Sequence, residues 1–588
     1  MAIENLITDH LDLWTAAARP KSSAGRGSNS KLELTGIKKL RELILELAVR
    51  GKLVPQDPSD EPASVLLERI AAEKGRLVKE GKIKRPKALP EIGEEEKPFE
   101  LPDGWEWSML AEIAEINPRN ESDDTVDASF VPMSLISTAY NGQHEFEARK
   151  WGEIKKGFTH FSNGDIGVAK ITPCFENSKA AVFRGLINGL GAGTTELHIA
   201  RPYTDYVSAF FILLNIKSPI YLKKGEAGMT GTAGQKRLAK DFFSFYPLPI
   251  PPFAEQRRIV AKVDELMALC DQLEQRSESQ LAAHQTLVEA LLATLTDSTD
   301  ADELAQNWAR LSTHFDTLFT TEASIDALKQ TILQLAVMGK LAPQDPSDEP
   351  ASALLERIAA KKAQLVKEKK IKKEKPLPAI SEDEKPFELP KGWEWCRLGA
   401  LMPQFQNGAS SRGDSGGIPI TVLRLADIKD WKVSLADTRE LSIDSKSIDK
   451  YLLEKGDTLI IRVNGSSDIV GRFIGCDENY DAIYCDHFIR MRFLVEVFNT
   501  RYLSLLGSSN IVRSKIADLF ISTAGQKTVN QGHISSIVLP LPSITEQNRI
   551  VAKVDELRTL CDQLKSRLQT SQQTQLALAE SLVEGALA

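Results

Sequence analysis

The chain has 588 residues, which at roughly 100–200 residues per domain predicts about three to five domains. Its composition, 42% hydrophobic and 26% charged, is that of an ordinary globular protein, and the net charge of −8 excludes a histone-like basic protein. No apolar run approaches about eighteen residues, no secretory signal is present, and the six cysteines form no CxxC pair, so we expect a cytoplasmic protein without a membrane partner.

The sequence contains two repeated blocks that frame two diverged segments. Residues 44–107 recur at 332–395 with 49 of 64 positions identical, and residues 254–274 recur at 545–565 with 16 of 21 identical. The segments between the blocks, 108–246 and 396–537, share little beyond short islands. This pattern indicates a tandem duplication that has kept its frame and diverged in its inserts.

The repeats predict six consecutive parts. They are an N-terminal segment ending in a flexible linker at 20–31 (1–31), a first helical frame (32–107), a first insert domain (108–253), a central frame with a long helix (254–395), a second insert domain (396–544) and a C-terminal long helix (545–588). The first frame lacks a preceding long helix, and the last long helix lacks a following frame. We therefore expect a closed, pseudo-two-fold molecule whose termini lie close together.

Each frame copy is predicted to be helical. First helices are expected at 36–50 and 324–338, where Gly51 and Gly339 end them. Second helices are expected to begin near Ser59–Pro62 and Ser347–Pro350, with the proline in the first turn. They are expected to run out in lysine-rich tracts, followed by exposed connectors rich in proline and acidic residues.

Each insert is predicted to be a mixed α/β domain. Runs rich in β-branched residues, such as 167–171 and 458–463, lie between Gly, Asn and Asp turn residues. Such a run bounded by turn signals is typical of a buried strand.

The second repeated block begins a long helix with a heptad pattern. In the second copy the seam comprises Ile550, Val554, Leu557, Cys561, Leu564 and Leu568, continuing more weakly to Leu578 and Leu582. The first copy has Ile259, Val263, Leu266, Cys270 and Leu273, loses the pattern at 277–284, and regains it at Leu287 and Leu291. About forty residues form a rod on the order of 60 Å long. Each helix could pack on its own domain, but the matched copies favour pairing with each other. The fold class is therefore mixed α/β: two globular domains joined by long antiparallel coiled-coil helices.

Catalytic and metal-binding motifs are missing from the sequence. No Gly-Lys pair has the spacing of a phosphate-binding loop. The tetrad Ile250-Pro251-Pro252-Phe253 resembles that of amino-methyltransferases, but Ile250 cannot accept a hydrogen bond from a target amino group. His487 follows Cys485 by two residues without a second ligand pair. We expect no catalytic residue and no metal site in this chain.

Three pairs of motifs match a known family. They are two Pro-x-Gly-Trp-x-Trp segments (102–107 and 390–395), two Thr-Ala-Gly-Gln-Lys loops (232–236 and 523–527), and two Pro-x-x-x-Glu-Gln-x-Arg-Ile segments that begin at Pro251 and Pro542. In this paired order the chain resembles the specificity subunit of Type I restriction–modification enzymes, over nearly all its length after about residue 32. The long first frame resembles the IB subfamily.

The resemblance implies that each insert is a target-recognition domain that reads one half of a split, asymmetric site in double-stranded DNA. The frame would space the two readers and dock two modification subunits, which hold S-adenosylmethionine. Two restriction subunits, which use ATP and Mg, would join for cleavage. This chain would itself be non-catalytic and carry no cofactor. Diverged inserts on a rigid frame suit the reading of two different sequences about one DNA turn apart, ~34 Å.

The charge balance places the acidic excess in the frame. The first insert has 15 basic and 15 acidic residues, and the second has 17 and 16. We therefore expect the inserts to contribute mainly base contacts and the partner subunits much of the phosphate attraction.

Polar loops that follow matching strands are the candidate base-reading segments. A Gly-Asp pair precedes the strand in each insert, at Gly164 and Gly456. The candidate residues are Lys170, Thr172, Glu176, Asn177 and Lys179 in the first insert, and Arg462, Asn464, Ser466 and Arg472 in the second. Solvated turns would explain the same pattern, and the two interpretations stay open.

The shared Thr-Ala-Gly-Gln-Lys loops supply four further candidates, Gln235, Lys236, Gln526 and Lys527. A loop shared by both inserts cannot discriminate two base sequences. We therefore interpret these four residues either as contacts to DNA phosphates or as residues that simply close the fold. The lysine-rich tracts are interpreted as solvated helix ends in preference to contacts with DNA or partners. The tracts comprise Lys79, Lys82, Lys84, Arg85, Lys87, Lys367, Lys369, Lys370, Lys372, Lys373 and Lys375. Base stacking by the tryptophan pairs is less favoured than one packed and one partly exposed ring per pair.

Two alternative functions remain at this stage. A single-chain methyltransferase or nuclease would require cofactor or catalytic motifs that the sequence lacks. A scaffold with two protein-binding inserts and no role on DNA would share the duplicated frame.

Overall fold

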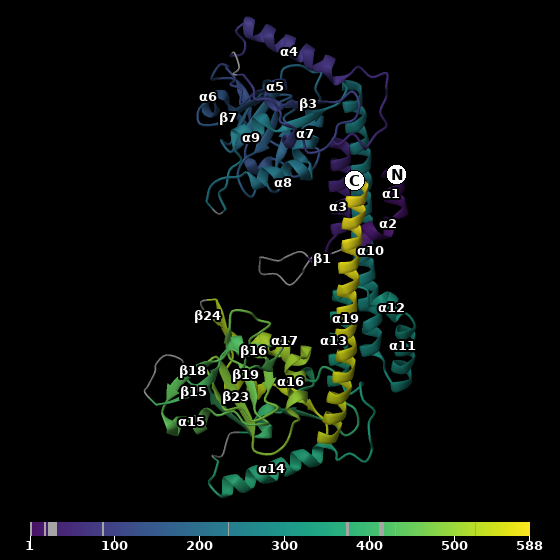
Figure 1. Ribbon diagram of the computed structural model, residues 1–588. Coiled ribbons are helices and arrows are strands. Elements are labelled where there is room, and N and C mark those ends of the chain that lie inside the picture. The colour runs from purple at the N-terminus through teal and green to yellow at the C-terminus, as the bar shows by residue number, and fades with distance from the viewer. Residues whose placement is uncertain are drawn as a thin grey trace. The chain divides into compact units, whose positions relative to one another are not determined.

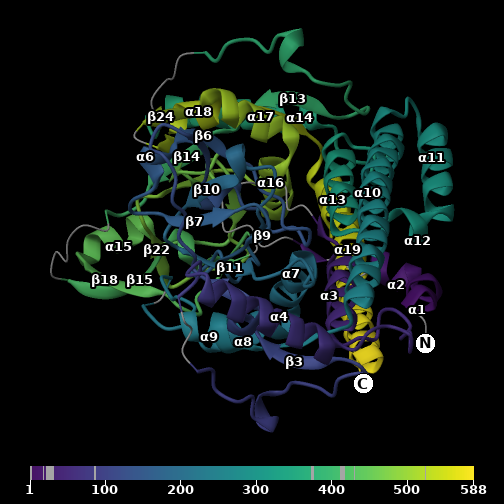
Figure 2. The same ribbon diagram turned by 90° about the horizontal axis from the view of Figure 1, so that it is seen from above.

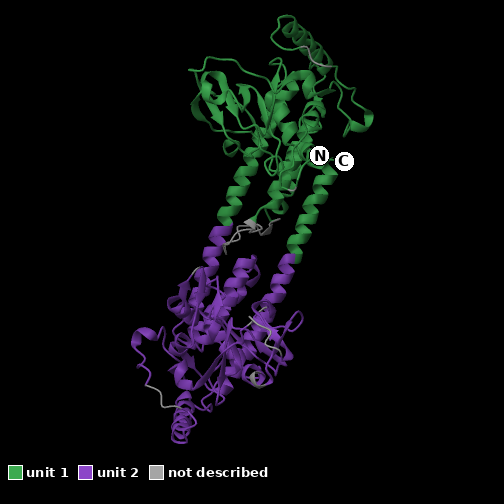
Figure 3. Ribbon diagram, turned by 90° about the vertical axis from the view of Figure 1, so that its left-hand side faces the viewer, with its two compact units in different colours: residues 1–280, 570–588 green, residues 281–569 purple. Residues whose placement is uncertain are grey.

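The computed structural model describes residues 3–16, 19–20, 32–84, 88–232, 234–371, 376–410, 417–429, 431–523 and 525–587. The chain forms two compact units, Met1–Gln280 with Thr570–Ala588, and Leu281–Gln569 (Figure 3). The expected linker at 20–31 lies outside the described residues except at its first position, and so do five tract residues: Arg85, Lys87, Lys372, Lys373 and Lys375. In the described part of the chain, no helix combines the length and apolar character needed to cross a membrane.

Each unit contains the first part of one long helix and the last part of the other. The helix α10 (Phe253–Asp297) begins in the first unit and ends in the second, whereas α19 (Ile544–Leu587) begins in the second and ends in the first (Figure 1). In the second unit, Val288 and Leu292 of α10 belong to the same hydrophobic core as Ile550 and Val554 of α19. The two long helices thus share a core, as their matched heptads predict.

A shorter frame helix packs against the first part of each long helix. These helices are α3 (Thr35–Val49) and α13 (Glu322–Val337), within two residues of the predicted bounds. Arg41 of α3 lies 2.6 Å from Asp271 of α10, and Lys329 of α13 lies 2.5 Å from Asp562 of α19, at the same positions of the duplication. The two units therefore have the same internal frame.

The predicted heptad seam is confirmed in its first half and wrong in its second. Val263, Cys270, Val554 and Cys561 are buried, and all six cysteines of the chain carry free thiols. By contrast, Leu287 is 51% exposed, and the following positions Val288, Leu292 and Leu295 are buried instead; the equivalent Leu578 is 53% exposed. A straight helix drifts by about 20° per heptad, and α10 meets a new set of neighbours after residue 280, so the buried stripe moves by one position.

Short helices pack beside the long helices in both units. In the first unit these are α1 (Ile3–Asp9) and α2 (Leu11–Ala16), and in the second α11 (Ala301–Thr313) and α12 (Phe315–Leu318). The α11 helix folds back along the end of α10, where Asn307 donates a hydrogen bond to the Thr294 carbonyl (Figure 2). None of these four helices follows from the heptad or repeat pattern.

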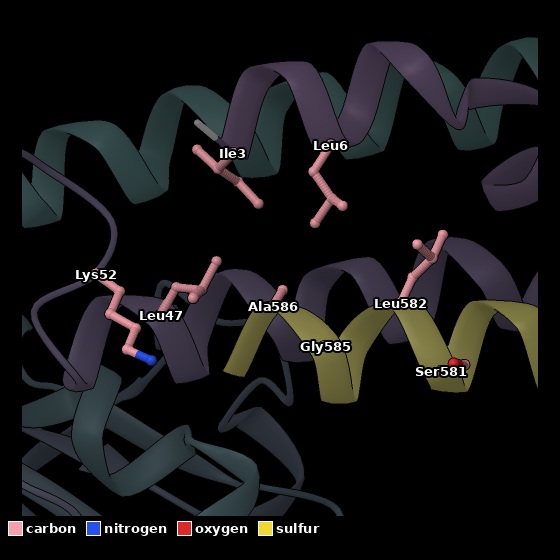
Figure 4. A pocket seen from close by; sticks show the side chains of 8 residues that line it. All are labelled: Ile3, Leu6, Leu47, Lys52, Ser581, Leu582, Gly585 and Ala586. Atoms are coloured by element: carbon pink, nitrogen blue, oxygen red, sulfur yellow. The ribbon is translucent and has the colours of Figure 1, made fainter. Parts of the chain in front are cut away.

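Both chain ends lie in the first unit, as the open ends of the duplication predict. Ile3 and Leu6 of α1 and Leu47 of α3 line a cavity of about 700 Å³ together with Leu582 of α19 (Figure 4). Lys52, which follows α3, donates a hydrogen bond of 2.9 Å to the carbonyl of Leu587.

The two inserts share a fold in spite of their divergence. The first contains a sheet of order β4-β11-β8-β9, and the second a sheet of order β14-β23-β19-β21, all antiparallel. The bounds are Ala114–Ile116 (β4), Leu197–Pro202 (β11), Ile166–Ala169 (β8), Ala180–Val182 (β9), Pro403–Asn407 (β14), Phe488–Phe493 (β23), Thr458–Ile461 (β19) and Phe473–Gly475 (β21). The predicted strands at 167–171 and 458–463 are β8 and β19, each at an inner position of its sheet.

A second sheet in each insert contains one parallel pair. Its order is β6-β5-β10-β7 in the first insert and β18-β15-β22 in the second, with β5–β10 and β15–β22 parallel. The bounds are Glu147–Lys150 (β6), Asp127–Val131 (β5), Leu190–Gly193 (β10), Thr159–Ser162 (β7), Arg439–Ile443 (β18), Ile418–Leu423 (β15) and Ala482–Tyr484 (β22). The mixed α/β class is therefore confirmed, and it is the same in both inserts.

Each insert is joined to the frame by a pair of strands. The strand β3 (Glu106–Met109) pairs with β12 (Pro247–Ile250), and β13 (Glu394–Arg397) pairs with β26 (Val538–Leu541). As predicted, one ring of each tryptophan pair is buried, Trp105 and Trp393, and the other is half-buried.

The identical frame motifs hold the frame and the insert together. Glu255, at the start of α10, accepts hydrogen bonds from the Trp105 indole at 2.9 Å and from the Gln56 amide at 2.8 Å. Gln256 accepts a hydrogen bond from the backbone of Ser208 in the insert. Gln344 and Gln547 make the equivalent contacts in the second unit. Buried polar groups require such partners, which explains why these motifs survive in both copies.

Long second helices complete each frame copy. They are α4 (Ala63–Lys79) and α14 (Ala351–Lys367), which begin at the end of the predicted segments; Pro62 and Pro350 precede the first turn rather than lying in it. The described lysines of the tracts are exposed, and Lys82 and Lys370 pair with neighbouring glutamates. Such pairs are typical of solvated helix ends.

Candidate nucleic-acid interface

In each insert the structure joins the two loops that the sequence nominated separately. In the first, Thr172 donates its N–H to the carbonyl of Lys236 at 3.0 Å, and the N–H of Lys236 donates to the Thr172 hydroxyl at 3.1 Å. In the second, β20 (Val463–Asn464) pairs with β25 (Gln526–Thr528), so that Asn464 lies opposite Lys527. The strand-exit loop and the Thr-Ala-Gly-Gln-Lys loop therefore form one surface in both inserts.

The candidate residues of the first insert differ in accessibility. Glu176, Asn177, Gln235 and Lys236 are exposed, and Lys170 is half-buried where β8 ends. Thr172 is buried, and its hydroxyl is engaged by Lys236 as described above.

Lys179 is turned away from the loop. Its ammonium donates a hydrogen bond of 2.7 Å to the carbonyl of Met133 in a neighbouring segment. The groups free to meet a ligand in this insert are therefore those of the exposed tip at 176–177 and of the adjoining loop at 235–236.

The candidate residues of the second insert are held more tightly. The side chain of Asn464 accepts the N–H of Ser466 at 2.8 Å, and the ammonium of Lys527 donates to the carbonyl of Gly465 at 3.1 Å. Arg462 is half-buried, with its backbone bonded to His487 and Val529. Among these candidates, Gln526 is the one with an exposed side chain.

Arg472 lies at the edge of this surface and stacks on an aromatic ring. Its guanidinium carbon lies 4.2 Å from the centroid of the Trp431 ring, and its Nε donates to the carbonyl of Asp468 at 2.7 Å. Burial lowers the pKa of Arg472 from its usual value. Trp431 is 43% exposed and was not nominated from the sequence, because a lone tryptophan in a loop gives no pattern.

A hairpin that carries the shared loop also escaped the sequence analysis. In the second insert β24 (Ile521–Thr523) pairs with β25, and in the first a bridge joins Thr230 to Arg237. Ile521 on this hairpin is 55% exposed.

The Gly-Asp pairs have a structural role. Asp165 is buried and accepts hydrogen bonds from the guanidinium of Arg201 at 2.7 and 2.9 Å, and Asp457 is held in the same way by Arg492. Burial raises the pKa of Asp165, and the Arg201 charge opposes this shift. Each pair fixes the start of the strand that leads to the candidate loop.

The described residues contain one group of three neighbouring potential metal ligands, Cys485, Asp486 and His487. They are consecutive in the chain, and burial raises the pKa of the Cys485 thiol, which disfavours the thiolate that binds metal. The prediction that the chain binds no metal remains untested.

Comparisons with known proteins agree with the resemblance in the motifs. A family model described as the Type I restriction modification DNA specificity domain matches residues 102–283. The chain is 54% identical to the Type I restriction enzyme EcoAI specificity subunit of Escherichia coli over 597 aligned positions, which cover 100% of both chains. It is also 54% identical over 596 positions to the EcoEI specificity subunit of the same species, again with full coverage. A solved structure, the HsdS subunit from Thermoanaerobacter tengcongensis, shares 17% identity over 84% of this chain and 98% of its own, with a TM-score of 0.41.

Proposed function

The chain belongs to the family of Type I restriction enzyme specificity subunits, and we propose on this premise that it is the DNA-recognition and scaffold subunit of a restriction–modification complex. Each insert reads one half of a split, asymmetric site in double-stranded DNA. The chain performs no catalysis itself. The two alternatives, a single-chain methyltransferase and a scaffold with two protein-binding inserts and no role on DNA, are not favoured.

One observation carries this proposal. Two inserts whose sequences have diverged contain one sheet of the same strand order, and each insert joins a diverged strand-exit loop to a shared loop. A common position with different side chains is what the reading of two different base sequences requires. The shared loop, with Gln235–Lys236 or Gln526–Lys527, suits contacts to the DNA backbone, which position the protein without discriminating sequence.

The frame is proposed to dock the partner subunits and to set the distance between the readers. At 1.5 Å per residue, the 45 residues of α10 make a rod of about 68 Å. The partners are two modification subunits, which hold S-adenosylmethionine, and two restriction subunits, which use ATP and Mg; this chain holds no cofactor. An IB-like complex in the cytoplasm is consistent with the long first frame and the free cysteines.

Methylation sequencing of a genome tests the proposal. The chain is expressed with its modification subunit in cells that lack both, and newly methylated positions are mapped. We expect a new motif of two short blocks around a fixed gap. If the complex assembles with its cofactor and still produces no new methylated motif, the assignment is refuted.

A further inference from the structure

In each insert a basic side chain, buried in the first and half-buried in the second, holds the backbone of the strand-exit loop. Lys217, at the end of α7 (Ala209–Lys217), is only 3% exposed. Its ammonium donates a hydrogen bond of 2.6 Å to the carbonyl of Ser178 and lies 3.5 Å from the carbonyl of Thr138. It therefore joins the loop that carries Glu176 and Asn177 to a second, neighbouring segment.

Arg513 in α17 (Asn510–Leu519) has the same role in the second insert. Its guanidinium donates to the carbonyl of Val470 at 2.9 Å and to that of Ser467 at 2.5 Å. These carbonyls belong to the turn that follows Asn464 and Ser466. The arginine thus fixes the far end of the loop, opposite the pairing of Asn464 with Lys527.

The two cations do not derive from the duplicated frame. The frame contacts recur at offsets of 288 and 291, but at an offset of 291 the position of Lys217 is occupied by Ser508, and that of Arg513 corresponds to Leu222. Diverged inserts have therefore placed a cation against the same loop from two different helices. A requirement of the loop, rather than shared ancestry of the residue, explains the coincidence.

Stability alone would not favour Lys217. Its printed partners are carbonyl oxygens, and burial alone lowers its pKa, so no opposite charge compensates for its burial among the described residues. A well-packed apolar side chain is usually as stable at such a position. A basic side chain that donates hydrogen bonds to two carbonyls does what an apolar side chain cannot do, which is to fix the loop in one conformation.

We propose that Lys217 and Arg513 are positioning residues for sequence recognition, each of which holds the reading loop of one half-site in its working conformation. This inference rests on the proposed function of the loops. In the first insert the loop borders a groove of about 960 Å³ lined by Glu176, Asn177 and Lys217, with Arg41 of α3 on the frame side. Glu176 and Asn177 are exposed, so their side chains are free to meet DNA. The bond from Lys217 to the neighbouring Ser178 carbonyl holds the backbone from which they project.

The test measures base discrimination at each half-site separately. The full-length chain is assembled with its modification subunits, and methylation rates are determined on duplexes that carry every single substitution in the two recognition blocks. We expect Lys217→Met to lower the rate on the cognate site by about tenfold or more and to flatten discrimination in one block only. Arg513→Met should do the same in the other block.

Matched controls separate positioning from general damage. Lys156→Met and Lys515→Met remove cations from the turn after α6 (Trp151–Ile154) and from α17, and both should behave as wild type. Arg513→Lys keeps a donor for one of the two carbonyls and should restore part of the discrimination. If Arg513→Met does not assemble, this milder variant still gives the answer. Equal loss in both blocks, or full discrimination in both methionine variants, would overturn the proposal.

A loop variant distinguishes failure of this inference from failure of the proposed function. Glu176→Ala with Asn177→Ala should relax the same block as Lys217→Met. If the loop variant relaxes base discrimination in that block and Lys217→Met does not, the positioning role of Lys217 is refuted while the proposed function stands. If the wild-type complex shows no discrimination between duplexes, the proposed function itself fails.

Discussion

The ammonium of Lys52 lies 2.9 Å from the carbonyl oxygen of Leu587, the last helical residue, although 535 positions separate the two residues in the sequence. The duplicated residue Lys340 makes the equivalent contact to Thr296 at 2.7 Å and a further one to Ser298 at 2.8 Å. In both units a lysine after the frame helix therefore satisfies carbonyls at the end of a long helix, where the helix dipole also favours a cation.

These two lysines should differ in their contribution to stability. Lys340 is half-buried and donates to two carbonyls, whereas Lys52 is exposed and donates to one. We expect Lys340→Met to reduce the free energy of unfolding of its unit by about 1–2 kcal/mol, and Lys52→Met by about 0.5 kcal/mol. Hydrogen exchange of the last turns of α10 and α19 measures both. A larger effect of Lys52→Met would contradict the comparison.

The buried pair Asp165–Arg201 provides a second test of stability. Replacing Arg201 with Met leaves the Asp165 carboxylate buried without its partner, and such changes cost about 3–5 kcal/mol. Because burial already raises the pKa of Asp165, the loss should shrink at low pH, where the carboxyl is protonated. Denaturant unfolding measures the change. The double variant Arg201→Met with Asp165→Asn, the matched control, should recover most of the stability.

Much of the frame could be predicted from the sequence because its signals are local. Gly51 ends α3 and Pro62 precedes α4 within one or two residues of the predicted positions. Thr172 and Lys236 lie 64 positions apart in the sequence, and no local pattern records their pairing. Lys217 was missed for a different reason: a lysine that ends an apolar helix is normally exposed, and only the packed insert shows that it is buried.

Lys217 should make stability depend on pH in the alkaline range. Burial lowers its pKa from 10.5 to about 7, so between these values the unfolded chain binds a proton that the folded chain does not. Stability therefore rises with pH across this window, and the contribution is lost as the pH falls toward 7. Melting temperatures of wild type and Lys217→Met between pH 7 and 10 test this. The difference between them should move in favour of the wild type as the pH rises, and a constant difference would show that Lys217 keeps an ordinary pKa.

Arg462 should affect one half-site alone. Arg462 belongs to the strand-exit loop of the second insert, two positions before Asn464, and its side chain is half-buried. Its carbonyl accepts a hydrogen bond from the N–H of Val529. We expect Arg462→Ala, like Asn464→Ala, to relax reading in one block of the methylated motif and to leave the other block and the gap unchanged. Methylation sequencing of cells that express each variant measures this. Equal relaxation of both blocks would show that the insert does not act as a separate reader.

The long helices should determine the gap between the two blocks. Seven residues added to α10 within 277–284, and seven added to α19 within the equivalent 568–575, preserve the heptad register and lengthen each helix by about 10.5 Å. Since DNA rises by about 3.4 Å per base pair, the gap should grow by about three base pairs while both blocks keep their sequence. Lengthening one helix alone should impair assembly instead, because the shared core would lose its register. An unchanged gap in the paired insertion, mapped by methylation sequencing, would show that the spacing is set elsewhere, by the partner subunits or by the DNA itself.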